Sequence, residues 1–198
     1  MKPASDEDLG FAFFCAAFAI ILGLSLGVVL GYSDPGVTTA AQSHFEASAV
    51  SQTAAVGQEI LAESPTGQVL APAFFVVLLI VNNLIVAGLI AFNHRFLIPV
   101  QSIIITSGAL FFNGFIAGAI LIREISMVGF VSIMSTIGLY WGFEMAAYVI
   151  AGAIGYYAIM HGRQSFDGNG IFIGWVFSLL AIGGGVEALI LVGPSSFL

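Results

Sequence analysis

The feature that most constrains this chain is a series of long apolar runs. Four are plain, and they extend from Phe11 to Gly31, from Ala73 to Phe92, from Ile98 to Ile122 and from Gly170 to Val192. A bilayer core of about 30 Å needs about 20 apolar residues in a helix, so each run is long enough to cross a membrane. Hydrophobic residues make up 59% of the chain and charged residues 8%, whereas soluble domains carry about 25% charged residues. A soluble globular protein is therefore excluded.

A further apolar stretch, from Ile125 to Met160, has an awkward length. Its roughly 35 residues are too many for one span and too few for two spans with a loop. The economical solution is a full span from Gly142 or Phe143 to Met160, preceded by a short helix over Ser126 to Tyr140. That helix would lie at the interface or re-enter the membrane. The expected fold class is an all-α integral membrane protein: a bundle of about five transmembrane helices plus one short re-entrant or interfacial helix.

These runs divide the chain into four regions. Residues 1–10 form a cytoplasmic N-terminus, 11–31 the first transmembrane helix, 32–71 an extracytoplasmic loop and 72–194 a four-helix membrane domain. The length of the first run favours an uncleaved anchor over a signal peptide. In the loop, the density of Ala, Gln and Glu between Thr38 and Ala62 predicts a helix, which either caps the bundle or docks a partner.

The four basic residues set the expected orientation. With five spans and a cytoplasmic N-terminus, Lys2, Arg95 and Arg163 lie inside and only Arg123 lies outside, as the positive-inside rule prefers. The chain is therefore expected to be a multi-pass protein of the cell membrane. So few basic residues, with a net charge of -7, also exclude a nucleic-acid-binding protein.

Polar side chains inside the apolar runs are the candidate functional residues, because a charged group at the centre of a span costs about 2.5–3.5 kcal/mol. Two carboxylates stand at similar expected depths in the outer half of the bilayer, and one arginine is near enough to pair with either. The predicted intramembrane polar site consists of Glu144, Glu187, Asn82, Asn83, Asn113 and Arg123. Such a set either lines a cavity for an ion, a proton or a head group, or locks the helices together.

Glycines predict where the helices approach each other closely. Three glycines in the first run are spaced by four residues, and two in the third run form a GxxxG. The predicted helix-packing residues are Gly23, Gly27, Gly31, Gly114, Gly118, Gly152 and Gly155. The triple glycine from Gly183 to Gly185, just before Glu187, predicts a bend, a loosened helix or very tight packing.

No catalytic motif accompanies these residues. The single cysteine, Cys15, lies in an apolar run, and His94 and His161 would have to converge to bind a haem or a metal. We expect no catalytic residue, no metal and no cofactor.

Two of the spans resemble the stage II sporulation protein M family of integral membrane proteins. In that family an acidic residue opens a span and small residues follow at fixed distances, as in the sequence EMAAYVIAGAIG that begins at Glu144. The family's last span tends to end with an alanine-rich turn, a glutamate and a proline, and LAIGGGVEA from Leu180 to Ala188, followed by Pro194, is similar. Where the family usually has a His-Gly pair, this chain has Trp141-Gly142.

Softer matches are Asn82-Asn83 in the second span and Asn113-Gly114 with Gly118 in the third. The resemblance covers about residues 73–194, and the scarcity of lysine fits an archaeal member. It implies a non-enzymatic membrane scaffold or complex subunit, because the sporulation members look like scaffolds that hold cell-wall hydrolases. The expected partners are the lipid bilayer and other membrane proteins or a second copy of the chain.

Two other functions stay open at this point. Glu144, Glu187 and the asparagines are the kind of set that lines ion paths, so a transporter or channel component is the main alternative. An intramembrane enzyme acting on lipid has only the two carboxylates in its favour.

Overall fold

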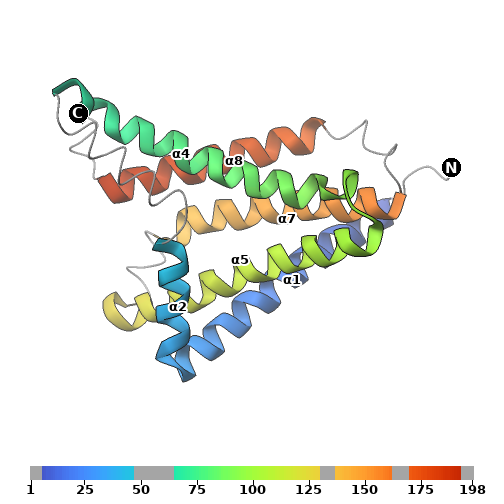
Figure 1. Cartoon of the computed structure of the whole chain (residues 1–198), viewed down its shortest axis with the longest axis horizontal. Coiled ribbons are helices and arrows are strands. Elements are labelled where there is room, and N and C mark those ends of the chain that lie inside the picture. Colours follow the sequence, from blue (N-terminus) through green and yellow to red (C-terminus); the bar gives the residue numbers. More distant parts are fainter. Residues whose placement is uncertain (1–5, 47–64, 130–136, 162–169, 193–198) are drawn as a thin grey trace.

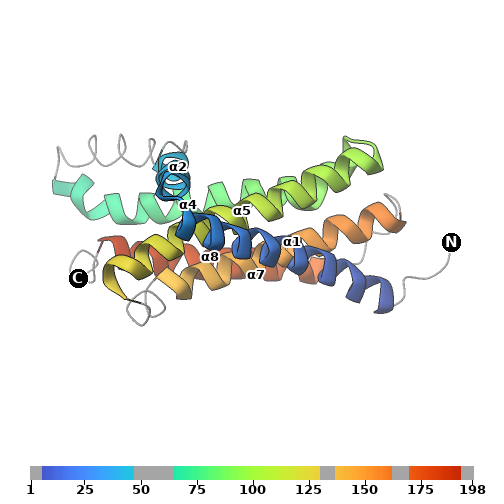
Figure 2. The same ribbon diagram turned by 90° about the horizontal axis from the view of Figure 1, so that it is seen from below.

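The computed structural model describes residues 6–46, 65–129, 137–161 and 170–192, and every element in these ranges is a helix. The elements are α1 (Asp6–Ser33), α2 (Pro35–Glu46), α4 (Pro65–Phe92), the 3-10 turn η1 (Asn93–Arg95), α5 (Pro99–Val128), α7 (Ile137–His161) and α8 (Gly170–Val192). The long helices lie along one axis, and α2 crosses the bundle (Figure 1, Figure 2). The all-α prediction is confirmed for the described residues.

Four helices are long and apolar enough to cross a membrane. Their apolar segments are Glu7–Ser33 of α1, Val76–Arg95 of α4 and η1, Pro99–Ser126 of α5 and Tyr140–His161 of α7. In α8 the corresponding segment within the described residues, Gly170–Val186, is shorter. The chain therefore has the helices of a multi-pass membrane bundle, and the count of five spans stays a prediction.

Successive long helices run in opposite directions (Figure 1). Gly27 of α1 faces Phe115 of α5, and Gly31 faces Ile122, so α1 and α5 are parallel. The start of α1 instead meets the end of α7, where Asp8 lies 3.4 Å from His161. This alternation is what five successive crossings would produce. The sidedness of the bundle stays a prediction, and Lys2 and Arg163 lie outside the described residues.

The central helix of the bundle is α7, which packs against α1, α4, α5 and α8. Half of its apolar segment is buried, compared with 28% of that of α1. Several of its buried positions are small, among them Ala147, Ala151 and Ala158, and larger side chains from the neighbouring helices, such as Leu110 and Leu180, belong to the same core. The hydrophobic core is therefore built around α7.

The tightest contact in the bundle joins α1 to α5. A Cβ atom placed on Gly27 would lie 2.1 Å from the carbonyl oxygen of Phe115, and one placed on Gly118 would lie 2.2 Å from that of Leu24. No side chain fits at such distances, so the two backbones meet through their glycines. The same holds for Gly23 and Gly114, with corresponding distances of 2.0 and 2.3 Å.

The remaining predicted packing glycines are also at helix contacts. A Cβ on Gly31 would lie 2.9 Å from Cγ2 of Ile122, and one on Gly155 would lie 2.7 Å from the carbonyl oxygen of Ile90. At Gly152 the nearest atom would be Cδ1 of Leu110, at 2.7 Å. All seven glycines thus lie at contacts between helices, and for α1 the packing partner lies within the chain.

Several helices extend beyond the predicted spans. The first helix starts at Asp6, ahead of the span expected from Phe11, because acidic residues at a helix N-terminus are favoured by the helix dipole. The second helix starts at Pro65, ahead of the span expected from residue 72 or 73. A proline at the first helical position loses no hydrogen bond, and both Pro65 and Pro72 satisfy the sequence signal for a start. The helix continues through Pro72.

The third helix does not stop at Ile122. It runs through Arg123 to Val128 and ends at Gly129, whose φ of 88° is a conformation that favours glycine. The expected separate helix over 126–140 is therefore wrong at both of its ends, because residues 126–128 belong to α5 and residues 137–140 begin α7. Residues 130–136 lie outside the described part.

The predicted extracytoplasmic helix is present in part, as α2. Asp34 separates it from α1, and its side chain accepts a hydrogen bond from the N–H of Gly36 at 2.8 Å. Thr38 and Ala41 are buried against the bundle, as expected of a cap. Residues 47–62 of the predicted helix lie outside the described residues.

Candidate functional site

Four polar side chains meet between α4 and α7, and we call them the α4–α7 polar cluster: Asn82, Asn83, Glu144 and Tyr148. Asn83 is its centre, because its side-chain amide donates a hydrogen bond to the carboxylate of Glu144. Its carbonyl oxygen accepts bonds from the Tyr148 hydroxyl at 3.0 Å and from the Asn82 amide at 3.3 Å. One asparagine thereby joins two helices through both ends of its amide.

The cluster lies inside the apolar part of the bundle. Asn83 is 7% exposed and Tyr148 is 3% exposed, whereas Glu144 and Asn82 are half-buried. Both Asn83 and Glu144 lie within the apolar segments of their helices, Val76–Arg95 and Tyr140–His161. Polar groups at this depth need partners, and the cluster supplies them.

The other predicted site residues do not join this cluster through the contacts that the structure describes. The side-chain amide of Asn113 donates to the carbonyl of Ala109 on its own helix, at 2.8 Å. Arg123 is half-buried near the end of α5, and the bond described for the Glu144 carboxylate comes from Asn83. The expected pairing of Arg123 with one of the two carboxylates stays a prediction. Glu187 belongs to α8, but its side chain lies outside the described part, so the proposed meeting of the two carboxylates stays a prediction.

Two of the three consecutive glycines of α8 pack closely against other helices, whereas a Cβ on Gly185 would meet no atom within 4 Å. The helix is continuous through Gly183 to Gly185. A Cβ on Gly183 would lie 3.3 Å from Cγ of Glu144, and one on Gly184 would lie 2.9 Å from Cγ1 of Ile80. The glycines therefore bring α8 onto the polar cluster, with α4 and α7 on either side.

Sequence reasoning missed Tyr148, although a signal was present. Tyr148 follows Glu144 by four residues, so both lie on one face of α7. Two other bonds between helices were also missed: Ser107 with Tyr156 at 2.5 Å, and Asn93 with Thr106 at 2.9 Å. Serine, threonine and tyrosine are common in membrane helices, so their presence alone does not predict a bond between helices. A pair can be recognised only when both side chains are known to lie on helix faces that meet.

Buried polar groups also gather at the opposite end of the bundle. Asn93, His94 and Ser102 are all buried where α4 turns into α5 through η1. The Nδ1 atom of His94 lies 3.0 Å from the carbonyl oxygen of Ala91, at hydrogen-bonding distance. His161 pairs with Asp8 between α7 and α1. In the described ranges no group of three or more His, Cys, Asp or Glu is placed to hold a metal ion.

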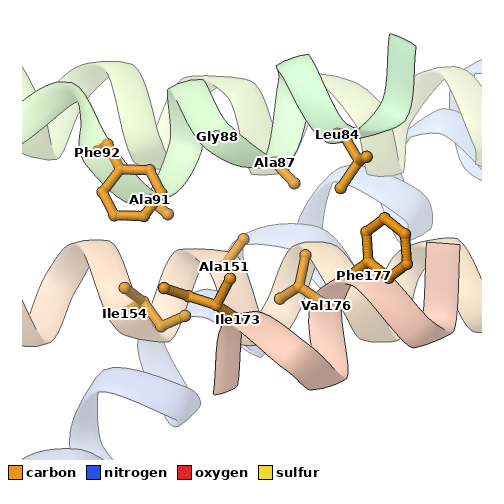
Figure 3. A pocket seen from close by; sticks show the side chains of 10 residues that line it. All are labelled: Leu84, Ala87, Gly88, Ala91, Phe92, Ala151, Ile154, Ile173, Val176 and Phe177. Atoms are coloured by element: carbon orange, nitrogen blue, oxygen red, sulfur yellow. The ribbon is translucent and has the colours of Figure 1, made fainter. Parts of the chain in front are cut away.

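An apolar cavity of about 130 Å³ lies between α4, α7 and α8. Figure 3 shows the side chains that line it. Five of its lining residues belong to α4, and side chains of α7 and α8 face them across the cavity. It is lined by Leu84, Ala87, Gly88, Ala91, Phe92, Ala151, Ile154, Ile173, Val176 and Phe177. It contains none of the polar residues discussed above.

Comparison of the chain with protein-family models, with curated proteins and with solved structures finds no match. The resemblance to the stage II sporulation protein M family therefore rests on the sequence motifs alone.

Proposed function

We propose that this chain is a non-enzymatic integral membrane scaffold or subunit of a membrane protein complex, which presents its outer helix faces to other membrane proteins. The observation that carries the proposal is the bonding of Asn83 to both Glu144 and Tyr148. Polar side chains of the spans are thereby used to hold helices together. The sequence resemblance to a family of scaffold-like proteins points the same way.

A scaffold needs a stiff frame, and close glycine packing supports one. Gly23, Gly27, Gly114 and Gly118 bring the backbones of α1 and α5 into contact, so neither helix can shift without losing that fit. Gly183 and Gly184 pack α8 against Glu144 and against Ile80 of α4. A transport path would instead need room for water or ions beside the carboxylate.

The surface best suited to a partner is the outer face of α1. Its exposed side chains recur at helical spacing and form one apolar stripe: Phe11, Phe14, Phe18, Ile21, Leu22 and Val29. Phe14 and Phe18 stack with their ring centroids 6.0 Å apart. Large aromatic side chains that are already ordered can contribute contact area to a partner at a small cost in entropy.

A photo-crosslinking amino acid at position 14 tests this proposal in native membranes. Its matched control is position 85 on α4, since Phe14 is 63% exposed and Ile85 is 59% exposed. We expect a protein adduct of defined mass from position 14 and lipid adducts alone from position 85. Equal adducts at both positions, or lipid adducts alone at both, would contradict a partner surface on α1.

The transport alternative has a separate test in liposomes. For a scaffold, Glu144→Gln should fold normally and leave ion and proton flux at the level of empty liposomes, as for the unmodified protein. Flux that requires the unmodified protein and disappears in Glu144→Gln would replace the scaffold proposal with the transport one.

A further inference from the structure

A second cavity of the bundle is a groove between α1, α5 and α7. We propose that this groove binds a membrane-soluble quinone, whose ring lies in the groove and whose carbonyl oxygen accepts a hydrogen bond from the hydroxyl pair of Ser107 and Tyr156. The site goes beyond the scaffold role. Phe14 and Phe18 belong both to the groove and to the apolar stripe of α1, so the quinone would lie at the edge of the partner surface. Its binding does not depend on a partner being present.

The groove has room for a ring-bearing molecule. Its volume is about 540 Å³, within the range of about 300–1,000 Å³ that is typical of small-molecule sites. The walls come from α1 and α5, and Tyr156 of α7 lines the groove as well. A Cβ on Gly108, in the α5 wall, would meet no atom within 4 Å. Space is therefore left beside this glycine.

The walls of the groove are held at a fixed separation. Leu22 and Phe111 line it, and a Cβ on the neighbouring Gly23 would lie 2.0 Å from the carbonyl oxygen of Phe111. The groove thus lies beside the backbone contact that joins α1 to α5, and both helices also pack on α7. A preformed site of this kind costs little free energy to order when a ligand binds.

The walls favour an aromatic ligand that is dissolved in the bilayer. Phe14 and Phe18 stack on the α1 side, with ring centroids 6.0 Å apart, and Phe111 lines the α5 side. Aromatic rings attract one another at centroid separations of about 4.5–7 Å. Phe14 and Phe18 are 63% and 54% exposed, so a molecule in the bilayer can reach the groove without crossing water.

The hydroxyl pair gives the groove one hydrogen-bond donor to spare. The oxygens of Ser107 and Tyr156 lie 2.5 Å apart, so one of the two hydroxyl protons lies between them. Across the described residues neither hydroxyl makes another hydrogen bond. Both lie in apolar segments, Pro99–Ser126 and Tyr140–His161, where the hydrocarbon offers no acceptor. The second proton therefore needs an acceptor in the ligand.

A quinone meets each of these requirements. Its carbonyl oxygens accept hydrogen bonds, its ring is flat and its prenyl tail is apolar. It carries no charge, and neither do the residues that line the groove. Phospholipids also have carbonyl groups, but these lie at the polar boundary of the bilayer, whereas both hydroxyls lie inside apolar segments.

Native mass spectrometry of the delipidated protein tests the proposal with two probes. One is a methylnaphthoquinone with a short prenyl chain, and the other is the naphthalene with the same methyl and prenyl groups but no carbonyl oxygen. We expect the quinone to bind about fivefold more tightly, as one added hydrogen bond would give. The double variant Ser107→Ala/Tyr156→Phe should abolish this preference by weakening quinone binding alone. Gly108→Leu, which fills the groove, should weaken the binding of both probes by about fivefold or more.

Two matched variants serve as controls. Tyr148→Phe removes the same hydroxyl elsewhere on α7, and Gly88→Leu adds the same side chain at an equally open glycine of α4. Both should bind the quinone within about twofold of the unmodified protein, since neither residue lines the groove. Equal binding of the two probes, or equal losses in the controls, would overturn the proposal. Displacement of the quinone by an equal concentration of phosphatidylglycerol would show an ordinary acyl-chain site instead.

Cys15 gives a second measurement that needs no variant. It is the only cysteine of the chain and it lines the groove. Saturating quinone should slow its reaction with N-ethylmaleimide several-fold in the unmodified protein, because the bound ring covers the thiol. An unchanged rate would mean that the quinone binds elsewhere, and the assignment of the groove would be wrong.

Discussion

Gly27→Ala adds a single methyl group at the contact between α1 and α5. The new Cβ would lie 2.1 Å from the carbonyl oxygen of Phe115, 2.9 Å from its carbonyl carbon and 3.0 Å from the amide nitrogen of Ala119. All three atoms belong to the backbone, so no side-chain rotation relieves the clash. The helices themselves must separate.

The required separation sets the expected cost. Carbon and oxygen atoms of neighbouring helices approach to about 3.3 Å, so the carbonyl of Phe115 must retreat by about 1.2 Å. A gap of 0.5–1 Å already forfeits about a quarter to a half of the dispersion energy between atoms in contact. Because Gly23, Gly114 and Gly118 share this contact, the loss spreads along it. Overpacking of this kind costs about 1–3 kcal/mol, and we expect Gly27→Ala in that range.

Unfolding in mixed micelles, with SDS as the denaturant, measures this free energy. The matched control is Gly10→Ala, also on α1, where the added Cβ would meet no atom within 4 Å. We expect the control to unfold within about 0.5 kcal/mol of the unmodified protein, as surface substitutions usually do. If Gly27→Ala is as stable as Gly10→Ala, then α1 does not contact α5 through Gly27 and the packing argument is wrong.

Two further predictions concern the polar cluster and the topology. Asn83→Leu removes the hydrogen bonds that Asn83 makes with Glu144 and Tyr148 and should cost about 1–3 kcal/mol in the same unfolding assay, whereas Asn113→Ala, which loses a bond to its own helix, should cost less than about 1 kcal/mol. Equal costs would mean that the cluster does not hold α4 to α7. Reporter fusions at residues 50, 95, 165 and 198 should read outside, inside, inside and outside. Reporters at the two ends of the chain on the same side of the membrane would refute five spans.

Hydropathy predicted the helical class and the approximate positions of the long helices, because the apolar length of a span is set by the bilayer. Helix ends were less predictable. The polar pair Arg123 and Glu124 looked like the end of a span, yet α5 passes through both and stops at Gly129. Side chains with long apolar stems can remain in a helix near the membrane surface, so charge alone does not end a helix.

The glycine contacts were predicted from spacing, but the partner of α1 was not. A GxxxG stripe predicts that another helix packs closely on α1, but it does not identify that helix. The polar site was also predicted only in part, because the sequence does not show which residues of different helices meet. Asn83 and Glu144 were recognised as residues that need partners, while the bond between them depends on α4 lying parallel to α7. Sequence spacing on one helix carries no information on the register of another.

The parallel pairing of α1 with α5 has a consequence for biogenesis. Phe115 follows Gly27 by 88 residues, and the chain must cross back through α4 before the two can meet. At about 5–20 residues per second, translation supplies that stretch in roughly 4 to 18 s. During this interval the glycines of α1 have no α5 to contact. The α7 helix, around which the core is built, emerges later still, so α1 and α5 are both made before the centre of the bundle is present.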